Sequence, residues 1–242
     1  MILPDWPRPQ SIRACVTHAD EFNELKQPFG FNLGLNCGDD ESRVRRRRRQ
    51  LADHLRLSAS PAWLDQRHGT TVAYAPEAAA VRAADASWSD QAGIACVVLT
   101  ADCLPILICD DRSSVVAAVH AGWRGLAAGI VEATVAALPV AAHRLSAWMG
   151  PAIGPAAFEV GAEVRDAFVS ADAGSADAFV PGQRCGHWQA DLFVLAQRRL
   201  RSAGLEAVHG GNHCTHSDPR LFSYRRNRNC GRFASLIWRC AD

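Results

Sequence analysis

The residues best suited to chemistry stand in the segment TADCLPILICDDRSSVVAAVHAGWRG, residues 100–125. Two apolar runs within it, 104–109 and 115–120, flank the polar sequence DDRSS, which has the length and composition of a hairpin loop. An antiparallel hairpin folded there pairs positions whose numbers sum to about 223 or 224, with an uncertainty of about one residue. This register predicts that the thiol of Cys103 lies beside the imidazole of His120.

A thiolate and an imidazole together favour zinc, and a catalytic zinc site has three protein ligands and one open coordination position. The third ligand that we expect is His68, which stands in QRHGTTV before a predicted strand and next to a glycine that permits close approach. A histidine taken alone is more often structural, so this prediction depends on the pairing of Cys103 with His120. Asp102 adjoins Cys103 and is the candidate for acid–base catalysis.

Two other kinds of site remain open for the same residues. Cys103 can act as a nucleophile with His120 as its base, which predicts a cysteine hydrolase of amide or peptidoglycan-related substrates. Such a dyad has no need of His68, whereas the zinc site requires it. A single copper centre for polyphenol oxidation would use Met149 as a weak axial ligand, but the nine histidines contain no His-x-His pair for a multicopper cluster.

A rival group of metal ligands stands in the sequence HGGNHCTH, residues 209–216. Its candidate ligands are His209, His213, Cys214 and His216. The two glycines indicate a turn that leads into a strand or loop. A second metal site at this segment is therefore an open alternative.

The elements that must position these residues are short strands and amphipathic helices in mixed order. Apolar runs predict strands over 12–16, 93–99, 104–109, 115–120 and 145–149. Helical periodicity covers 43–57, 125–138, 161–169 and 191–203. Strands that follow one another from 93 to 120 argue against a doubly wound parallel sheet, so we expect mixed or antiparallel sheets with helices outside them. The stretch 170–186, rich in Ala, Asp and Gly, is expected to form a mobile loop.

Length and composition indicate one folded domain over residues 1–242. The chain is 48% hydrophobic and carries a net charge of +1, from 26 basic and 25 acidic residues, so its overall charge favours neither nucleic acid nor an anionic membrane. The basic run RVRRRRRQL from Arg43 has three interpretations: a nucleic-acid contact, which the neutral net charge disfavours, a solvated helix face, or a helix in which one arginine turns inward to meet an anion. We expect a small-molecule partner, and a monomer or weak oligomer.

The N-terminal sequence MILPDWPRPQ lacks the apolar core of a secretory signal, and no later stretch is long and apolar enough to span a bilayer. These features predict a cytoplasmic protein. In that compartment the nine cysteines are expected to be reduced thiols, metal ligands or nucleophiles rather than disulfides.

Several motifs of the chain together resemble the laccase-domain family, also called the YfiH type. They are NLGLNCGDD, QRHGTTV, TADCLPILICD, AAVHAGWRG, GPAIGPAAFEVG, CTHSDPRLFSYRR and GRFASLIW, in this order along nearly the whole chain. The resemblance implies an α+β (mixed α/β) domain in which two mixed sheets form a sandwich with outer helices. It also implies zinc ligands in the QxHG, TADC and VHAGWRG motifs, which are again His68, Cys103 and His120.

Members of that family are described as purine nucleoside phosphorylases, and older names call them polyphenol oxidases or laccases or link them to peptidoglycan editing. The resemblance therefore implies a zinc-dependent enzyme that cleaves adenosine, inosine, guanosine and methylthioadenosine with phosphate and also deaminates adenosine. For deamination zinc would activate water, and for phosphorolysis it would orient phosphate.

By the same resemblance Arg48 is an inward arginine that binds phosphate, and Asn32 hydrogen-bonds the nucleoside. Other residues are candidates because of their side-chain chemistry. Guanidinium groups bind phosphate in a bidentate geometry, and aromatic side chains can line the wall of a substrate pocket. These further candidates are Arg124, Arg225, Arg226, Phe222 and Tyr224.

The chain departs from the usual family pattern at Asn36, Cys37, Arg67 and His216. None of the four is one of the three expected zinc ligands. The departures therefore bear on substrate preference more than on the class of reaction.

Overall fold

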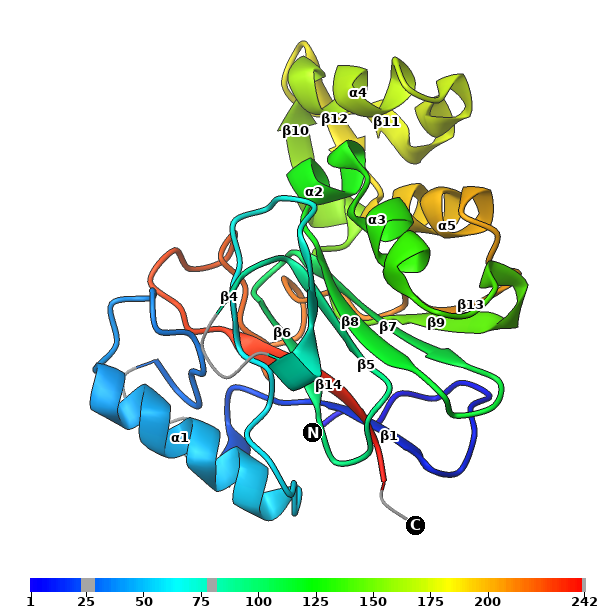
Figure 1. Ribbon diagram of the computed structural model, residues 1–242. Helices are drawn as coiled ribbons and strands as arrows, with labels where there is room; N and C mark the ends of the chain where they lie inside the picture. The colour runs from blue at the N-terminus through cyan, green and yellow to red at the C-terminus, as the bar shows by residue number, and fades with distance from the viewer. Residues whose placement is uncertain (23–28, 78–81, 241–242) are drawn as a thin grey trace.

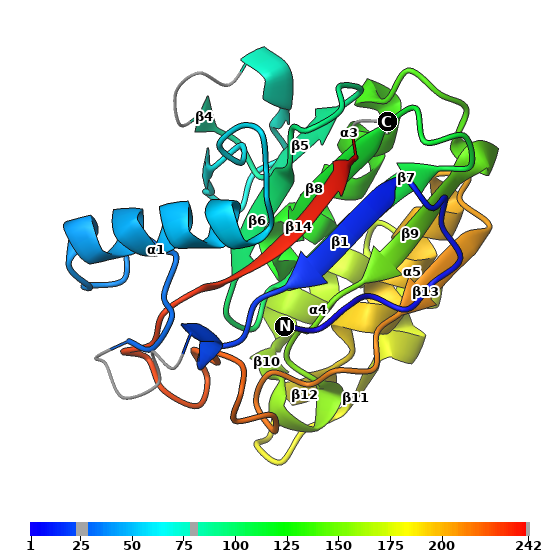
Figure 2. The ribbon, with the colours of Figure 1, turned by 90° about the horizontal axis from the view of Figure 1, so that it is seen from below.

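Two β-sheets lie face to face in the computed structural model, which describes residues 1–22, 29–77 and 82–240 (Figure 1). The larger sheet has the strand order β13-β9-β7-β8-β5-β3, and the smaller has the order β1-β14-β6. Figure 2 shows β1 and β14 lying across the strands of the larger sheet. The strands are β1 (Ile12–Val16), β3 (Val72–Tyr74), β5 (Ala86–Ser89), β6 (Cys96–Thr100), β7 (Leu104–Asp110), β8 (Val116–Ala121), β9 (Leu145–Met149), β13 (Ala207–Gly210) and β14 (Phe233–Arg239).

The side chains of β7 build the core on both sides of the larger sheet. Leu107 and Cys109 join the apolar cluster between the two sheets, together with Ile237 of β14. Ile106 and Ile108 point the other way, into the cluster beneath the helices. Because both faces of this strand are covered, its sequence is a continuous apolar run rather than an alternating pattern.

Helices cover the outer faces of both sheets, as Figure 1 shows. Those on the larger sheet are α2 (Trp123–Ala128), α3 (Ile130–Ala137) and α5 (Leu192–Ser202), and the one on the smaller sheet is α1 (Glu41–His54). α1 buries Leu51 against the smaller sheet. Its N-terminus is capped by Asp40, whose carboxylate accepts the backbone N–H of Arg43.

Two smaller sheets and four short 3-10 helices complete the described fold. The small sheets are formed by β2 (Leu64–Asp65) with β4 (Arg82–Ala83), and by β10 (Glu159–Gly161), β12 (His187–Ala190) and β11 (Phe179–Pro181). The 3-10 helices are η2 (Ala75–Glu77), η3 (Ala142–Arg144), η4 (Pro155–Ala157) and η5 (Ala173–Ala178). The three-stranded β10-β12-β11 sheet and α4 (Ala162–Val169) lie together at one end of the molecule (Figure 1).

The predicted fold class, a mixed α/β arrangement with outer helices, is confirmed. One detail is wrong: the smaller sheet is antiparallel throughout, whereas only the larger one is mixed. All nine cysteines are free thiols. Within the described ranges, no helix has the length and apolar character needed to cross a membrane.

Two predicted elements differ from the structure for local reasons. The expected helix over 125–138 is divided into α2 and α3 at Gly129, whose φ of +99° interrupts the helix. The expected loop over 170–186 contains η5 and β11. Asp172 caps η5 by accepting the N–H of Gly174, and burial of Phe179 fixes β11 in the core.

The hairpin of β7 and β8 has a register one position beyond the predicted pairing. Leu104 lies opposite Ala121, and Pro105 lies opposite His120. The turn is displaced along the chain because the carboxylate of Asp110, at the end of β7, accepts backbone N–H groups from the residues that lead into β8. One of these is the N–H of Ser114, at 2.6 Å. Cys103 therefore precedes β7, in the short segment by which the chain crosses from β6 of the smaller sheet into the larger sheet.

Candidate metal centre and substrate pocket

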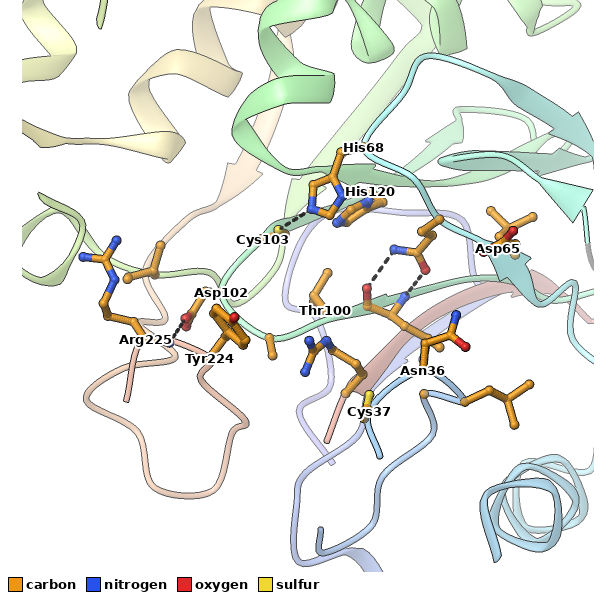
Figure 3. A pocket seen from close by; sticks show the side chains of 18 of the residues that line it. Asn36, Cys37, Asp65, His68, Thr100, Asp102, Cys103, His120, Tyr224 and Arg225 are labelled. Carbon is orange, nitrogen blue, oxygen red and sulfur yellow. Dashed lines mark hydrogen bonds between the residues drawn. The ribbon is translucent and has the colours of Figure 1, made fainter. Parts of the chain in front are cut away.

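A pocket of about 880 Å³ opens where the chain crosses between the two sheets (Figure 3). Its wall is formed by segments far apart in the sequence, including residues 34–37, 99–103 and 224–225. His68 and His120 also face this pocket. The crossing thus brings the three predicted metal ligands to the wall of one pocket.

The three predicted ligands form one compact group. One ligand atom each from His68, Cys103 and His120 lies within 4.8 Å of the other two. Cys103 Sγ is 3.6 Å from His68 Nε2, and the two imidazole centroids are 4.7 Å apart. Within residues 1–22, 29–77 and 82–240, no second cluster of three His, Cys, Asp or Glu side chains is arranged to hold a metal ion.

Asp85 at the start of β5 orients two of these ligands. Its Oδ1 atom lies 2.7 Å from Nδ1 of the buried His120. This contact occupies Nδ1 and leaves Nε2 as the nitrogen available to a metal. The Asp85 carboxylate also accepts the successive backbone N–H groups of Arg67, His68 and Gly69, at 3.1, 2.8 and 2.7 Å.

These backbone bonds hold His68 in an unusual conformation. His68 has a φ of +61°, in the left-handed region that L-residues seldom adopt. Gly122 leaves the space that the ring needs, since a Cβ atom on it would lie 2.8 Å from Cδ2 of His68 and 3.0 Å from Sγ of Cys103. The glycine after β8 is therefore required by close packing around the ligands.

The electrostatics of the group favour a thiolate. Burial alone would raise the pKa of Cys103, but the charge of His120 and hydrogen bonds from His120 and His68 outweigh it and lower the pKa to about 6. Burial likewise acts to lower the pKa of His120. The negative charge of Cys103 and the hydrogen bond to Asp85 outweigh burial there and raise it to about 9.

This donor set fits a zinc ion. Zinc–sulfur and zinc–nitrogen bonds of ordinary length, at a tetrahedral angle, place the two donor atoms about 3.5 Å apart. The observed separation between Cys103 Sγ and His68 Nε2 is 3.6 Å. Three protein ligands facing a pocket leave a fourth position open to water or substrate, as in catalytic zinc sites.

Asp102 lies in the pocket wall beside Cys103. Its backbone is also left-handed, with a φ of +92°. Oδ1 accepts the hydroxyl of Thr215 at 2.6 Å, and Oδ2 accepts the backbone N–H of Arg225 at 2.7 Å. The carboxylate is therefore held in a fixed place next to the metal ligand.

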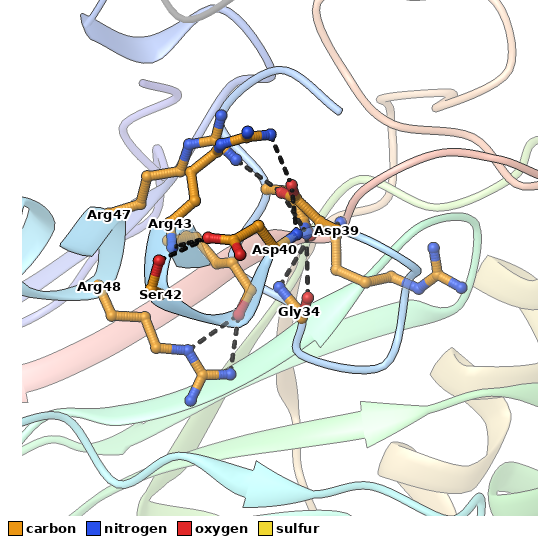
Figure 4. A network of polar contacts seen from close by, with 10 residues as sticks. Gly34, Asp39, Asp40, Ser42, Arg43, Arg47 and Arg48 are labelled. Atoms are coloured by element: carbon orange, nitrogen blue, oxygen red, sulfur yellow. Dashed lines mark hydrogen bonds and ion pairs between the residues drawn. The ribbon is translucent and has the colours of Figure 1, made fainter. Parts of the chain in front are cut away.

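Two arginines of the basic run turn inward, where one was predicted. Arg48 faces the pocket and donates from Nε and Nη2 to the carbonyl of Leu33, at 2.9 and 2.8 Å. Arg47 is fully buried, and its Nη1 lies 2.7 Å from Oδ2 of Asp39 (Figure 4). Asp39 also accepts from Arg43 at 3.0 Å, so this carboxylate joins α1 to the loop before it.

Asn32 lies behind the pocket wall rather than in it, contrary to the predicted nucleoside contact. It is fully buried. Its Nδ2 donates to the carbonyl of Gly34 and to Asp39, and its Oδ1 accepts the N–H groups of Gly34 and Arg232, both at 2.8 Å. The amide is used within the protein, where it holds the loop 34–37 that lines the pocket.

The remaining arginine candidates have separate surroundings. Arg225 lines the pocket, with its guanidinium donating to the carbonyls of Ala157 and Glu159. Arg226 donates to backbone carbonyls, including that of Thr215, and is absent from the pocket wall. Arg124 is exposed and stacks on Trp123, with 4.3 Å between its Cζ atom and the ring centroid, so the structure does not bring it to the site.

Of the other candidates from the sequence, some line the pocket and some lie elsewhere. Tyr224 lines the pocket and is 47% exposed, whereas Phe222 is buried in the core. Met149 lies in the core cluster under the helices and not in the pocket wall, so it is not placed as an axial copper ligand. The rival segment 209–216 forms no ligand group among the described residues.

Asp85 is the functional residue that sequence reasoning missed. It stands in the sequence AADASW, where a single carboxylate precedes a short buried strand. Asp85 is 2% exposed. A charged residue beside an apolar strand is the signal that could have identified it, because a buried carboxylate requires hydrogen-bond donors or a cation.

Comparison with known proteins identifies a family and several relatives of this chain. A family model described as "Multi-copper polyphenol oxidoreductase laccase" matches residues 16–240. A Pseudomonas aeruginosa protein named purine nucleoside phosphorylase is 53% identical over 239 residues, covering 98% of this chain and 97% of that protein. The Escherichia coli protein named purine nucleoside phosphorylase YfiH is 43% identical, with 98% of each chain covered.

Solved structures extend the similarity to the fold. A crystal structure of a Neisseria meningitidis protein matches with a TM-score of 0.94 and 42% identity over 99% of both chains. The YfiH structure from Bacillus licheniformis matches with a TM-score of 0.87 and 26% identity over 94% of this chain and 92% of that one. The arrangement of sheets and helices described above is thus shared along nearly the whole chain.

Proposed function

This chain belongs to the family of the multi-copper polyphenol oxidoreductase laccases, the YfiH-type proteins, and we propose that it is a zinc-dependent purine nucleoside phosphorylase. The observation that carries the proposal is the group of His68, Cys103 and His120 at the wall of a pocket that is also lined by arginine side chains without a carboxylate partner among the described residues. Relatives that share nearly the whole chain bear the name of this activity.

The proposed substrates are adenosine, inosine, guanosine and methylthioadenosine. A pocket of about 880 Å³ has room for a nucleoside together with phosphate. Phe158 and Tyr224 offer aromatic faces for a purine ring, and both belong to the pocket wall. Stacking on an aromatic face is available to every purine, so these contacts suit several purine nucleosides.

In phosphorolysis, an oxygen of phosphate forms a bond to the anomeric carbon of ribose as the bond from that carbon to the purine nitrogen breaks. The electron pair leaves with the purine, which takes up a proton, and ribose 1-phosphate remains. Arg48 binds phosphate, Arg225 lies at the rim as a second anion contact, and the Asp102 carboxylate faces the positive charge that develops on the sugar. The sugar carries that charge only near the transition state, so a fixed carboxylate lowers the barrier.

The metal would be held by His68, Cys103 and His120. When bound there, zinc supplies a Lewis acid that makes hydroxide available at neutral pH, the nucleophile that deamination of adenosine requires. We therefore include adenosine deaminase activity in the proposal. His120 is kept in the tautomer that offers Nε2 by its contact with Asp85, and Cys103 is kept ready as a thiolate by the neighbouring imidazoles.

A second candidate is a cysteine hydrolase that acts on amide or peptidoglycan-related substrates. The observation in its favour is the pKa of Cys103, lowered to about 6 against burial by His120 and His68, because a thiolate beside an imidazolium is an activated nucleophile. A dyad needs only one imidazole, so it does not require the second one, His68, to be held in a left-handed conformation 3.6 Å from the sulfur. The zinc proposal accounts for all three side chains.

The deciding experiment incubates the zinc-loaded protein with adenosine, inosine or methylthioadenosine, with and without inorganic phosphate. We expect free base and ribose 1-phosphate (or its methylthio derivative) only when phosphate is present, and inosine from adenosine in either case. Chromatography separates these products. Nucleosides left unchanged in the presence of phosphate would refute the purine proposal and direct the next assays to amide substrates.

A further inference from the structure

We propose that Arg232 and Thr100 complete, together with Arg48, a binding subsite for inorganic phosphate in the wall of the metal-centre pocket. The inference rests on the proposed function for the role of phosphate as co-substrate. Both residues stand in motifs that carry the family resemblance, TADCLPILICD and GRFASLIW, but the resemblance assigns neither of them a role.

The two arginines flank the same pair of backbone residues. Arg48 donates to the carbonyl of Leu33 and lies over the ring of Trp63, with 4.0 Å between its Cζ atom and the ring centroid. Arg232 accepts the N–H of Leu33 at its backbone carbonyl, at 3.0 Å. Its stem packs on Gly34, where a Cβ atom would lie 2.9 Å from Cγ of the arginine. One segment therefore fixes both side chains.

Both guanidinium groups keep N–H donors for a ligand. Arg48 uses Nε and Nη2 on Leu33, and its Nη1 has no hydrogen-bond partner among the described residues. Arg232 uses Nη1 on the carbonyls of Cys230 and Gly231, and its Nε and Nη2 have no partner in the same described part of the chain. In the part of the chain that the structure describes, neither arginine has a carboxylate within 4 Å, although both lie in the pocket wall.

These positive charges are compensated only in part, by the nearby carboxylate of Asp39, which is already paired with Arg43 and Arg47. Burial and then the charge of Arg45 lower the pKa of Arg48 to about 10, so the side chain is still a cation at neutral pH. Two acidic side chains also line the pocket, Asp65 and Asp102. Asp65 is paired with Arg67, and Asp102 accepts hydrogen bonds at both oxygens. An anion of two charges, such as phosphate, suits this wall.

The charges of both arginines influence the thiol of Cys37, which also lines the pocket. Burial raises the pKa of this thiol overall; the charge of Arg232 acts to lower it, that of Asp39 to raise it, and that of Arg48 to lower it. Cys37 thus lies within electrostatic range of both guanidinium groups. An anion bound beside Cys37 can therefore interact with both cations at once.

Thr100 supplies a third donor. It is 1% exposed, lines the pocket and has a hydroxyl without a hydrogen-bond partner among the described residues. A buried hydroxyl that stays unpaired is costly, so such a group in a pocket wall indicates a ligand. Thr100 lies opposite Phe233 across β6 and β14, which puts it at the same end of the sheet as Arg232.

The subsite faces the metal ligands across the pocket. In Figure 3, Thr100 lies between Cys37 on one side and the group of His68, Cys103 and His120 on the other. Phosphate held there by Thr100 and the two arginines would stand next to the space for the nucleoside. This position explains how one pocket can bind the two substrates together.

The first test measures the binding of inorganic phosphate to the full, zinc-loaded chain by isothermal titration calorimetry. R232M should weaken phosphate binding by at least about tenfold, because it removes a charge-assisted contact. R49M is the matched control, since Arg49 is exposed on α1 and its loss changes the net charge by the same amount. Equal phosphate affinity in R232M and R49M would overturn the inference.

The second test uses Thr100→Val, which removes only the hydroxyl. We expect a rise in melting temperature without phosphate, because an unpaired buried hydroxyl is replaced by a methyl group, and a two- to tenfold loss of phosphate affinity. Thr100→Ser should restore the affinity. A purely structural hydroxyl gives the opposite sign in melting temperature and unchanged phosphate binding, and that result refutes the role of Thr100.

Failure of the inference and failure of the proposed function give different results. If wild-type protein cleaves nucleosides with phosphate while R232M and Thr100→Val keep the wild-type phosphate affinity, the subsite is elsewhere and the function stands. If phosphate binds and both variants weaken it but no nucleoside is cleaved, the subsite stands and the purine reaction is wrong. Wild-type protein without measurable phosphate binding refutes the subsite.

Discussion

Asp85 Oδ1 lies 2.7 Å from Nδ1 of His120 and accepts the backbone N–H of His68 at 2.8 Å. One carboxylate oxygen therefore sets the tautomer of one metal ligand and the backbone position of another. Metal-bound histidines commonly donate their second ring nitrogen to such a carboxylate, which fixes the ring and raises its basicity. Asp85 would thus position the ligands of a metal held by His68, Cys103 and His120 without being a ligand itself.

We predict that Asp85→Asn lowers zinc affinity by about ten- to a hundredfold, because the amide fails to hold His120 and the turn at His68 as the carboxylate does. Competition with a chromophoric chelator measures the change. Asp110→Asn is the matched control: Asp110 is also a buried carboxylate that accepts backbone N–H groups, at a hairpin turn outside the pocket wall. If both variants lose zinc equally, Asp85 acts only through the fold.

The zinc content of ligand variants separates the two candidate functions. Wild-type protein prepared without chelator should carry about one zinc ion per chain, and both His68→Ala and Cys103→Ser should lose most of it, since a hydroxyl is a far poorer zinc ligand than a thiolate. Elemental analysis gives the answer directly. Full zinc retention in an inactive Cys103→Ser protein would favour the cysteine hydrolase.

Zinc affinity should rise with pH between about 7 and 9. In the metal-free protein the pKa of His120 is raised to about 9 by Cys103 and Asp85, while that of Cys103 is lowered to about 6. Zinc therefore displaces one proton from His120 in this window, and affinity should increase about tenfold for each pH unit. Calorimetry in buffers of different ionisation enthalpy counts the proton released, and an affinity independent of pH from 7 to 9 would contradict the prediction.

Asn32 and Asn36 should respond in opposite ways to removal of the amide. Asn32→Ala leaves the N–H groups of Gly34 and Arg232 without an acceptor, which should cost about 2 to 4 kcal/mol in the free energy of unfolding. Asn36 is exposed in the pocket wall, so Asn36→Ala should change the KM for nucleoside and leave stability nearly unaltered. Urea denaturation of both variants is the measurement, and equal stabilities would refute the framework role of Asn32.

The grouping of His68, Cys103 and His120 could be predicted from sequence because these residues follow strong local signals. Cys103 and His120 stand beside two apolar runs joined by a short polar loop, and a register error of one position still left them near each other. The displacement came from Asp110, whose side chain accepts N–H groups beyond the turn. Side-chain bonds of this kind move a turn without changing the apolar pattern.

The pocket residues were harder to predict because exposure to a pocket is a tertiary property. Asn32 and Arg48 were both assigned to substrate by resemblance, but only Arg48 lies in the pocket wall. Arg232 and Thr100 reach the wall because β14 pairs with β6, across more than 130 positions of sequence. The sequence contains no local pattern that announces this pairing. Asp85 has a local signal, a charge before a buried strand, but its partners Gly69 and His120 lie 16 and 35 positions away.

The last prediction separates phosphorolysis from deamination. Arg48→Met should impair phosphate-dependent cleavage of inosine more than deamination of adenosine, because only the first reaction uses phosphate. Loss of a charge-assisted contact costs roughly 1.5 to 3 kcal/mol, which is about a ten- to hundredfold fall in kcat/KM for phosphate. Arg49→Met provides the control for net charge, since this exposed arginine lies outside the pocket wall. Arg48 also donates to Leu33 and packs on Trp63, so a purely structural role would lower both activities together with the melting temperature. A selective loss of phosphorolysis at an unchanged rate of deamination is therefore the result that assigns Arg48 to phosphate binding. Equal losses of the two activities would show that Arg48 has only a structural role.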